Sequence, residues 1–184
     1  MNQINFTPFP LITTECLSLR QLVIEDEKEV FILKSDEKVI EFLDRPKAKT
    51  LYEARQLIKE IKDGIIRNEW ILWAIHLKGT QEFVGTVCLW NISVYESRAD
   101  IGYELLPCFQ GKGIMQEAVT AVIKYGFEIM KLYTIEAVVN KDNEKSIKLL
   151  KRNHFIEKEK FKEKSSFQEK ISEMIIYERI NNRY

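Results

Sequence analysis

The sequence has few of the residues that stabilise small secreted or metal-bound proteins. Its three cysteines, Cys16, Cys88 and Cys108, are widely spaced and form no Cys-x-x-Cys pair. An odd number of distant cysteines argues against a disulfide framework and against a zinc cluster. We therefore expect no structural metal and a reducing, cytoplasmic environment.

Long apolar runs and an excess of one charge are also absent. No apolar run reaches the roughly 20 residues of a membrane-spanning helix, and residues 1–9 lack the basic and apolar regions of a secretory signal. Lysine and arginine number 28 together, as do aspartate and glutamate. Because nucleic-acid-binding proteins usually carry a basic excess, neither a nucleic acid nor a membrane is an expected partner.

The composition suits one globular domain over residues 1–184, since apolar residues make up 45% and charged residues 30%. Period-two alternation predicts strands, and apolar residues at helical spacing predict helices. Strands are expected at 16–24, 70–77, 83–90, 100–106, 135–139, from 155 onward, and at 171–180. Helices are expected at 25–35, 50–68, 114–130 and 142–152.

This order predicts an α/β (α+β) fold with about seven strands and flanking helices. An antiparallel meander forms the first half, and strand–helix–strand units follow. Residues 158–170 are expected to be a charged connection. Residues 171–180 are expected to be an edge strand.

Several local signals fix the ends and faces of the predicted helices. Thr50 and Glu53 match a capping box at the start of helix 50–68. His154 is expected to end a helix, because histidine tolerates positive φ, and His76 is expected to be a sheet residue. The inward face of helix 114–130 is expected to carry Ala118, Val119, Val122 and Ile129.

The segment IGYELLPCFQGKGIMQEA, residues 101–118, carries the main functional signal. It predicts a strand, then a loop with Gly111 and Gly113, and then an amphipathic helix. The first N–H groups of a helix have no intrahelical partner, and neighbouring glycines let a ligand approach them closely. The segment therefore predicts a site for a phosphate or pyrophosphate group.

Two common phosphate loops fit this segment poorly. A P-loop would need glycine at 106 and a hydroxyl residue at 113, where the sequence has Leu106 and Gly113. A dinucleotide fingerprint would need a third glycine at Gln116, with Glu136 as its acidic residue. That match is partial, and the strands that precede the loop disfavour it.

A third pattern, Q/R-x-x-G-x-G/A, has Gln110, Gly113 and Met115 at its defining positions, with Met115 departing from the small residue expected last. Four further segments support it: TECLSLR at 14–20, FVG at 83–85, DIGYELLP at 100–107 and NEKS at 143–146. Together they resemble the GNAT family of N-acetyltransferases, in particular its ribosomal-protein N-terminal (RimJ/RimL-type) branch. The resemblance covers residues 11–177.

The resemblance implies a splayed parallel pair, strands 100–106 and 135–139, with acetyl-CoA held in the gap and no metal. The main chain of residues 105–106 would pair with the pantetheine arm, and Asn143 would also contact the arm. Asp142 or Asn140 can cap helix 142–152, which would leave the Asn143 side chain free for this contact. The implied cofactor-binding residues are Leu105, Leu106, Gln110, Gly111, Lys112, Gly113, Ile114, Met115, Asn143 and Ser146.

The resemblance also suggests the acid and the base of the reaction. Ser146 is the candidate acid for the departing thiolate, with Tyr133 and Tyr177 as alternatives. Glu104 is the first candidate for the general base, and Asp100 is the second. Two further aromatic residues are candidates either for the acceptor pocket or for the core, Tyr103 and Trp90.

The implied reaction is direct attack of a primary amine on the thioester, without a covalent enzyme intermediate. The branch suggests a protein N-terminal α-amine, such as that of a ribosomal protein, as the acceptor. Because many members of this fold dimerise through edge strands, the resemblance also suggests a homodimer through strand 171–180, although the sequence does not fix the oligomer. A small amine (polyamine, amino acid or aminoglycoside) is an alternative acceptor. A non-catalytic module that binds acetyl-CoA is a further alternative.

Overall fold

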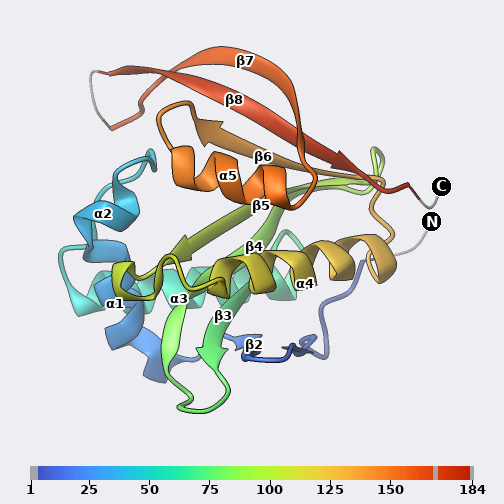
Figure 1. Cartoon of the computed structure of the whole chain (residues 1–184). Coiled ribbons are helices and arrows are strands. Elements are labelled where there is room, and N and C mark those ends of the chain that lie inside the picture. Colours follow the sequence, from blue (N-terminus) through green and yellow to red (C-terminus); the bar gives the residue numbers. More distant parts are fainter. Residues whose placement is uncertain (1–3, 168–169, 183–184) are drawn as a thin grey trace.

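An eight-stranded sheet organises the chain, and the computed structural model describes residues 4–167 and 170–182. The strand order is β1-β2-β3-β4-β5-β6-β8-β7 (Figure 1). The strands are β1 (Ile12–Thr13), β2 (Leu17–Gln21), β3 (Ile71–Leu77), β4 (Phe83–Ser93), β5 (Arg98–Leu105), β6 (Thr134–Asn140), β7 (Ile156–Lys164) and β8 (Ile171–Ile180). The helices are α1 (Glu27–Ser35), α2 (Glu37–Ile40), α3 (Leu51–Ile66), α4 (Ile114–Glu128) and α5 (Glu144–Arg152), with short 3-10 turns η1 (Ile24–Asp26) and η2 (Pro107–Phe109).

The predicted α/β fold with a mostly antiparallel sheet is confirmed. Among the described strand pairs, β5 and β6 form the parallel one, and α4 is the crossover between them. The sheet has eight strands instead of about seven because the short strand β1 pairs with β2. The sequence gives little sign of a strand of two residues.

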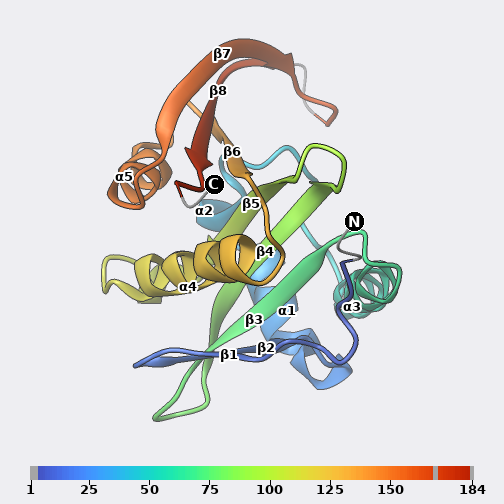
Figure 2. The same cartoon turned by 90° about the vertical axis from the view of Figure 1, so that its right-hand side faces the viewer.

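Helices cover both faces of the sheet and so bury its centre. Figure 2 shows α4 and α5 on one face and α1 and α3 on the other. Strand β3 is buried along most of its length, as expected for a strand covered on both sides. Trp73 in its middle is fully buried, and its indole Nε1 donates to the carbonyl of Pro10 at 2.8 Å.

The predicted N-cap at Thr50 and the helix end at His154 are confirmed. Thr50 Oγ1 accepts from the N–H of Glu53 at 3.2 Å at the start of α3. The Glu53 carboxylate accepts from the N–H of Lys49 at 2.7 Å, one residue before the N-cap, and so does not complete the predicted capping box with Thr50. His154 follows α5 with φ of 61°. His76 lies buried in β3 against Arg20, with Nε2 2.9 Å from the Arg20 Nη2.

Three predictions near the C-terminal half are wrong. Residues 158–164 belong to β7 and are not part of a connection. The prediction failed because their alternating Glu and Lys side chains resemble those of a solvated loop. As β7 pairs with β8, β7 is the edge strand and β8 lies inside the sheet. Ile129 is 66% exposed, because α4 ends at Glu128 and Ile129 turns away from the core.

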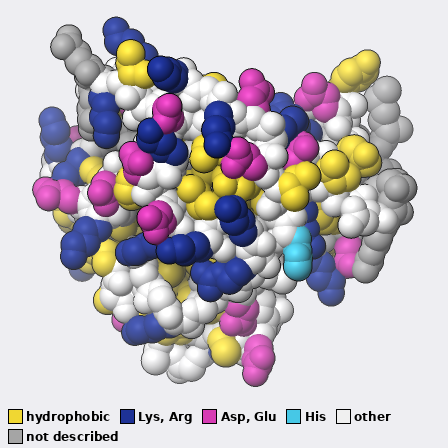
Figure 3. Space-filling model, turned by 45° about the horizontal axis from the view of Figure 1, so that its top comes forward, with side chains coloured by type: hydrophobic (Ala, Val, Ile, Leu, Met, Phe, Trp, Pro, Cys, Tyr) yellow, Lys and Arg dark blue, Asp and Glu magenta, His cyan; other side chains and the backbone are white. Residues whose placement is uncertain are grey.

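No helix in the described ranges is long and apolar enough to cross a membrane. Figure 3 shows acidic and basic side chains interspersed over the face turned to the viewer. That mixture agrees with the equal numbers of acidic and basic residues in the sequence. No strongly one-signed surface is visible on that face.

Gly85 in β4 sets how closely β4 and β5 approach each other. A Cβ built there would overlap the main-chain carbonyl oxygen of Glu104 on β5. We expect Gly85→Ala to lower the free energy of unfolding by about 1–3 kcal/mol, since the strands must move apart. Urea denaturation measures the change.

Gly79, in the turn between β3 and β4, provides the matched control, because no heavy atom lies within 4 Å of a Cβ built there. Gly79→Ala is expected to keep the stability of the wild type. If both variants unfold at the same urea concentration, the close approach of β4 and β5 at Gly85 is not the constraint described here.

Candidate active site

The parallel strands β5 and β6 are paired only at their beginnings. The Cα partners are Arg98 with Thr134, Ala99 with Ile135 and Asp100 with Glu136. Beyond these pairs β5 continues to Leu105 and β6 to Asn140 without contact between them in the ladder, and the two strands diverge (Figure 1). The divergence leaves main-chain groups of β5 facing a gap.

Two carboxylates meet at the last pair, Asp100 and Glu136, where like charges would repel. Arg98 Nη1 lies 3.2 Å from Asp100 and 2.7 Å from Glu136, and Lys158 of β7 lies 2.5 Å from Glu136. Burial raises the pKa of Asp100. Burial also opposes ionisation of Glu136, but Lys158 and Arg98 outweigh it and lower the pKa of that carboxyl. These charges hold the closed end of the gap.

The glycine loop lies at the start of α4 and is open to a ligand. Gly111 and Gly113 have φ of 77° and 79°, and no heavy atom lies within 4 Å of a Cβ built on either. Gly113 is the N-cap of α4, and no side chain caps the helix. Within the described chain, the first N–H of α4 that donates to a carbonyl of the preceding turn is that of Glu117, which bonds to the Gly113 carbonyl at 3.1 Å. The preceding N–H groups can therefore donate to phosphate oxygens.

Three side chains of this loop are engaged within the protein. Gln110 Nε2 donates to the Leu105 carbonyl at 3.1 Å, and its Oε1 accepts from Lys145 Nζ at 3.0 Å. Lys112 Nζ lies 5.5 Å from the centre of the Phe109 ring. Met115 is buried, so its departure from the small residue of the pattern places bulk in the core and not over the loop.

The predicted main-chain contacts at Leu105 and Leu106 differ in availability. The N–H of Leu106 donates to the Val84 carbonyl on β4 at 2.9 Å, and its carbonyl accepts from Phe109 N–H at 3.0 Å. Successive residues of a strand direct these groups to opposite edges. The N–H of Leu105 consequently faces the gap, whereas both groups of Leu106 are already bonded.

Asn143 and Ser146 come together at the start of α5, beside Tyr103. Asn143 is the N-cap, and its Oδ1 accepts from Ser146 N–H at 3.1 Å. The prediction that Asp142 or Asn140 caps this helix is therefore wrong. The amide Nδ2 of Asn143 is left to meet a ligand. Ser146 Oγ lies 2.6 Å from the hydroxyl of Tyr103 on β5.

The alternative acids lie away from this contact. Tyr133 directly precedes β6 at its paired end, and Tyr177 is buried in β8 opposite Ala137. Neither contacts Ser146 among the described hydrogen bonds. Tyr103, weighed in the sequence as a pocket or core residue, is the tyrosine that the fold brings to Ser146.

Glu104, on the opposite face of β5, is held between two cations. Lys34 Nζ of α1 lies 2.5 Å from Oε2, and Arg45 Nη2 lies 2.5 Å from Oε1. Burial raises the pKa of Glu104, but Lys34 and Arg45 outweigh it and lower the pKa below its usual range. Burial lowers the pKa of Lys34, against the attraction of Glu104. Local sequence patterns do not reveal these two partners, because both are distant from Glu104 along the chain.

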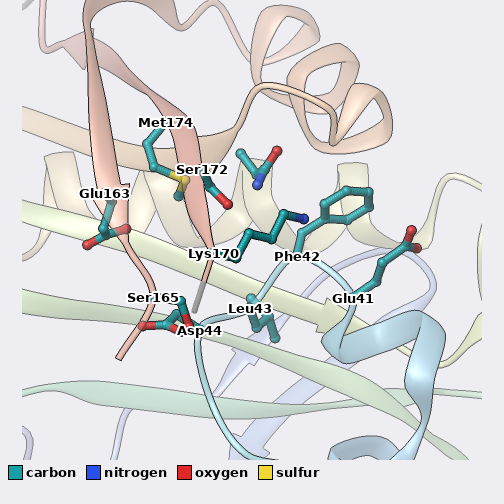
Figure 4. A pocket seen from close by; sticks show the side chains of 10 residues that line it. Glu41, Phe42, Leu43, Asp44, Glu163, Ser165, Lys170, Ser172 and Met174 are labelled. Atoms are coloured by element: carbon teal, nitrogen blue, oxygen red, sulfur yellow. Dashed lines mark hydrogen bonds between the residues drawn. The ribbon is translucent and has the colours of Figure 1, made fainter. Parts of the chain in front are cut away.

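A pocket lies beside Asn140, the last residue of β6, at the diverging end of the strands. Figure 4 shows the loop after α2 facing the β7–β8 hairpin across it, with Phe42 and Met174 from opposite sides. Asp44 joins the two walls, because its carboxylate accepts from Ser165 Oγ at 2.5 Å and from Ser166 N–H at 2.8 Å. The lining residues are Glu41, Phe42, Leu43, Asp44, Asn140, Glu163, Ser165, Lys170, Ser172 and Met174.

This arrangement of diverging strands and a glycine loop agrees with the comparison to known families. Residues 17–156 match a family model described as acetyltransferase (GNAT) domain. The matched range contains β2 to β6, the glycine loop and α5. The chain therefore belongs to the GNAT acetyltransferase family, and it is an N-acetyltransferase.

Relatives are found by sequence and by structure. The chain is 31% identical over 147 residues to the uncharacterized N-acetyltransferase YoaA of Bacillus subtilis (strain 168), covering 80% of this chain and 83% of YoaA. It is 29% identical over 141 residues to spermidine N(1)-acetyltransferase of Escherichia coli (strain K12), covering 76% and 72%. A structure of RimL, ribosomal L7/L12 alpha-N-protein acetyltransferase, in complex with coenzyme A superposes with a TM-score of 0.86 at 22% identity, covering 95% and 100%.

The ion pairs of Glu104 predict an acid-sensitive contribution to stability. We expect Glu104→Gln to lower the free energy of unfolding at neutral pH by about 3 kcal/mol, because Lys34 and Arg45 lose their buried partner. The stabilisation is present above the unfolded-state pKa of glutamate, about 4.3, and is lost as the pH falls through the lower folded-state value. The difference between wild type and variant therefore shrinks in acid, as urea titrations at a series of pH values would measure.

Glu37→Gln is the matched control, since Glu37 pairs with Lys47 at 3.1 Å on the surface and its side chain is 85% exposed. Its stability is expected to stay close to that of the wild type. A destabilisation by Glu104→Gln that persists unchanged in acid would contradict the lowered pKa of Glu104.

Proposed function

We propose that this acetyltransferase uses acetyl-CoA as donor and a protein N-terminal α-amine as acceptor. The choice of acetyl-CoA as donor rests on the start of α4, which has no side-chain cap, is lined by glycines and lies at the open end of the diverging strands. The acceptor is supported by the fold shared with RimL, which covers nearly the whole of both chains. The free thiols of Cys16 and Cys108, exposed and unpaired, agree with a cytoplasmic enzyme.

The donor site would use main chain more than side chains. N–H groups over residues 111–116 would bind the pyrophosphate at the positive end of α4. The pantetheine arm would lie along β5 like an added strand, bonding to the main chain of Leu105, while Asn143 Nδ2 meets it from α5. Bound there, acetyl-CoA supplies the thioester that the amine attacks.

The chemical step would be a direct attack by a neutral amine. The N–H of Leu105, which faces the gap, would stabilise the developing oxyanion. Ser146 would give its hydroxyl proton to the departing sulfur. Glu104 would accept a hydrogen bond from the amine or from a water between them; its lowered pKa makes it a weak base, so the proton passes on to solvent.

The pocket beside Asn140 would receive the acceptor. Its walls combine apolar side chains, Phe42, Leu43 and Met174, with polar and acidic ones. An N-terminal peptide would place its first side chain against the apolar part and its chain along the β7–β8 hairpin. A polyamine is a second candidate, because Glu41 and Glu163 line the same pocket and a spermidine N(1)-acetyltransferase is among the relatives.

An acceptor screen tests the function. The purified protein is given acetyl-CoA with N-terminal peptides that begin with small residues, with spermidine, with amino acids or with aminoglycosides, and free thiol is read. We expect the highest kcat/KM with a peptide, and a peptide of the same sequence with a blocked N-terminus to give no thiol. Turnover of spermidine alone would overturn the peptide proposal, and binding of acetyl-CoA without turnover of any amine would favour a non-catalytic module.

Gly113 is expected to control donor affinity. A Cβ at φ of 79° costs about 1–2 kcal/mol of backbone strain. It projects into space where no protein atom lies within 4 Å, and we expect the phosphate to occupy that space. We expect Gly113→Ala to weaken acetyl-CoA binding by about tenfold or more in calorimetry. Gly79→Ala is the control, and equal affinities for both variants would contradict the phosphate site.

A further inference from the structure

Tyr103 and Ser146 make a contact that bridges the two sides of the diverging strands. Tyr103 belongs to β5, and Ser146 belongs to α5, the helix that follows β6. Their oxygens are 2.6 Å apart, although the residues are 43 positions apart in the chain. The bridge lies on the same side of β5 as α5, whereas the neighbouring Glu104 side chain points to α1.

The surroundings of each hydroxyl indicate which one donates. Each hydroxyl has one proton, so only one of the two can donate in this contact. A phenol is the more acidic of the two and therefore the better donor. Burial raises the pKa of Tyr103 to about 12, so the phenol keeps its proton at neutral pH. Among the described residues, the Tyr103 hydroxyl has Ser146 Oγ as its hydrogen-bond partner.

The position of Ser146 is fixed from its main chain as well. The N–H of Ser146 donates a hydrogen bond to Asn143 Oδ1 at 3.1 Å, which holds Ser146 in the first turn of α5. With Tyr103 donating to Oγ, the serine O–H must point elsewhere. Tyr103 on β5 and Ser146 on α5 belong to the two sides of the gap between β5 and β6, and under the proposed function the thioester would lie in that gap, within reach of the serine O–H.

We propose that Tyr103 is a positioning residue, which donates a hydrogen bond to Ser146 Oγ and thereby directs the serine O–H at the sulfur of the thioester. The inference rests on the proposed function. In the step, the amine nitrogen bonds to the acetyl carbon, the C–S bond breaks, and its electron pair stays on sulfur. Sulfur takes the Ser146 proton, Tyr103 stabilises the serine oxygen, and the proton lost by the amine returns through solvent to Ser146, so protons balance.

Tyr103→Phe, Ser146→Ala and the double variant form the test. Tyr103→Phe keeps the ring that packs against the core and removes only the hydroxyl. Tyr125→Phe is the matched control, because Tyr125 is half-buried in α4 against Trp73 with no side-chain hydrogen bond in the described chain. Each variant is measured for kcat, for the KM of acetyl-CoA, and for the pKa of the thiol of bound coenzyme A. The thiol pKa is obtained from the thiolate absorbance as a function of pH, with the enzyme without coenzyme A as the blank.

We expect Ser146→Ala to lower kcat by about 100-fold and Tyr103→Phe by about tenfold, the loss of one hydrogen bond. KM is expected to change little, and the bound thiol is expected to have a raised pKa in both variants. The double variant should match Ser146→Ala, because Tyr103 acts only through Ser146. Tyr125→Phe should match the wild type.

The outcomes separate this inference from the proposed function. If Ser146→Ala changes neither kcat nor the thiol pKa, the assignment of Ser146 as the acid fails, and the role of Tyr103 fails with it. If Ser146→Ala behaves as expected but Tyr103→Phe matches the wild type, only the role of Tyr103 is overturned. Additive losses in the double variant would show that Tyr103 acts independently of Ser146 and would also overturn it.

Discussion

The interrupted pairing of β5 and β6 is the constraint on which the rest of the molecule depends. Parallel strands joined by a helix would normally continue their ladder, but here it ends at Asp100 and Glu136. Arg98 and Lys158 neutralise the two facing carboxylates there, so the closed end is held while the other end is open. Beyond that point β5 remains paired with β4, but its main-chain groups on the side of β6 have no strand partner. An unpaired edge of this kind can take an amide-bearing ligand.

Strand alternation divides the chemistry of β5 between the two faces of the sheet. Tyr103 points to α5 and contacts Ser146, and Glu104 points to α1 and contacts Lys34. The next residue, Leu105, offers its N–H to the gap itself. Three consecutive residues thus serve the proposed acid, the acceptor side and the proposed oxyanion site, because side chains alternate with period two and main-chain groups lie in the plane.

Prediction from the sequence succeeded where the signal was local. The glycine loop, the cap at Thr50 and the helix end at His154 depend on residues close in the chain. It failed at β7, whose repeated Glu and Lys side chains carry no apolar alternation. An edge strand needs no buried face, since one side is solvated and charges there discourage pairing with other chains. The strand is therefore defined by its register with β8, which the sequence does not show.

The sequence by itself determined the GNAT fold and the glycine loop, because these follow from short motifs and from periodicity. Only the tertiary structure decided that Lys34 and Arg45 surround Glu104, and that Tyr103 reaches Ser146. Those contacts join residues far apart in the chain, and their existence depends on sheet register and on where helices pack. Short-range patterns carry no information about either.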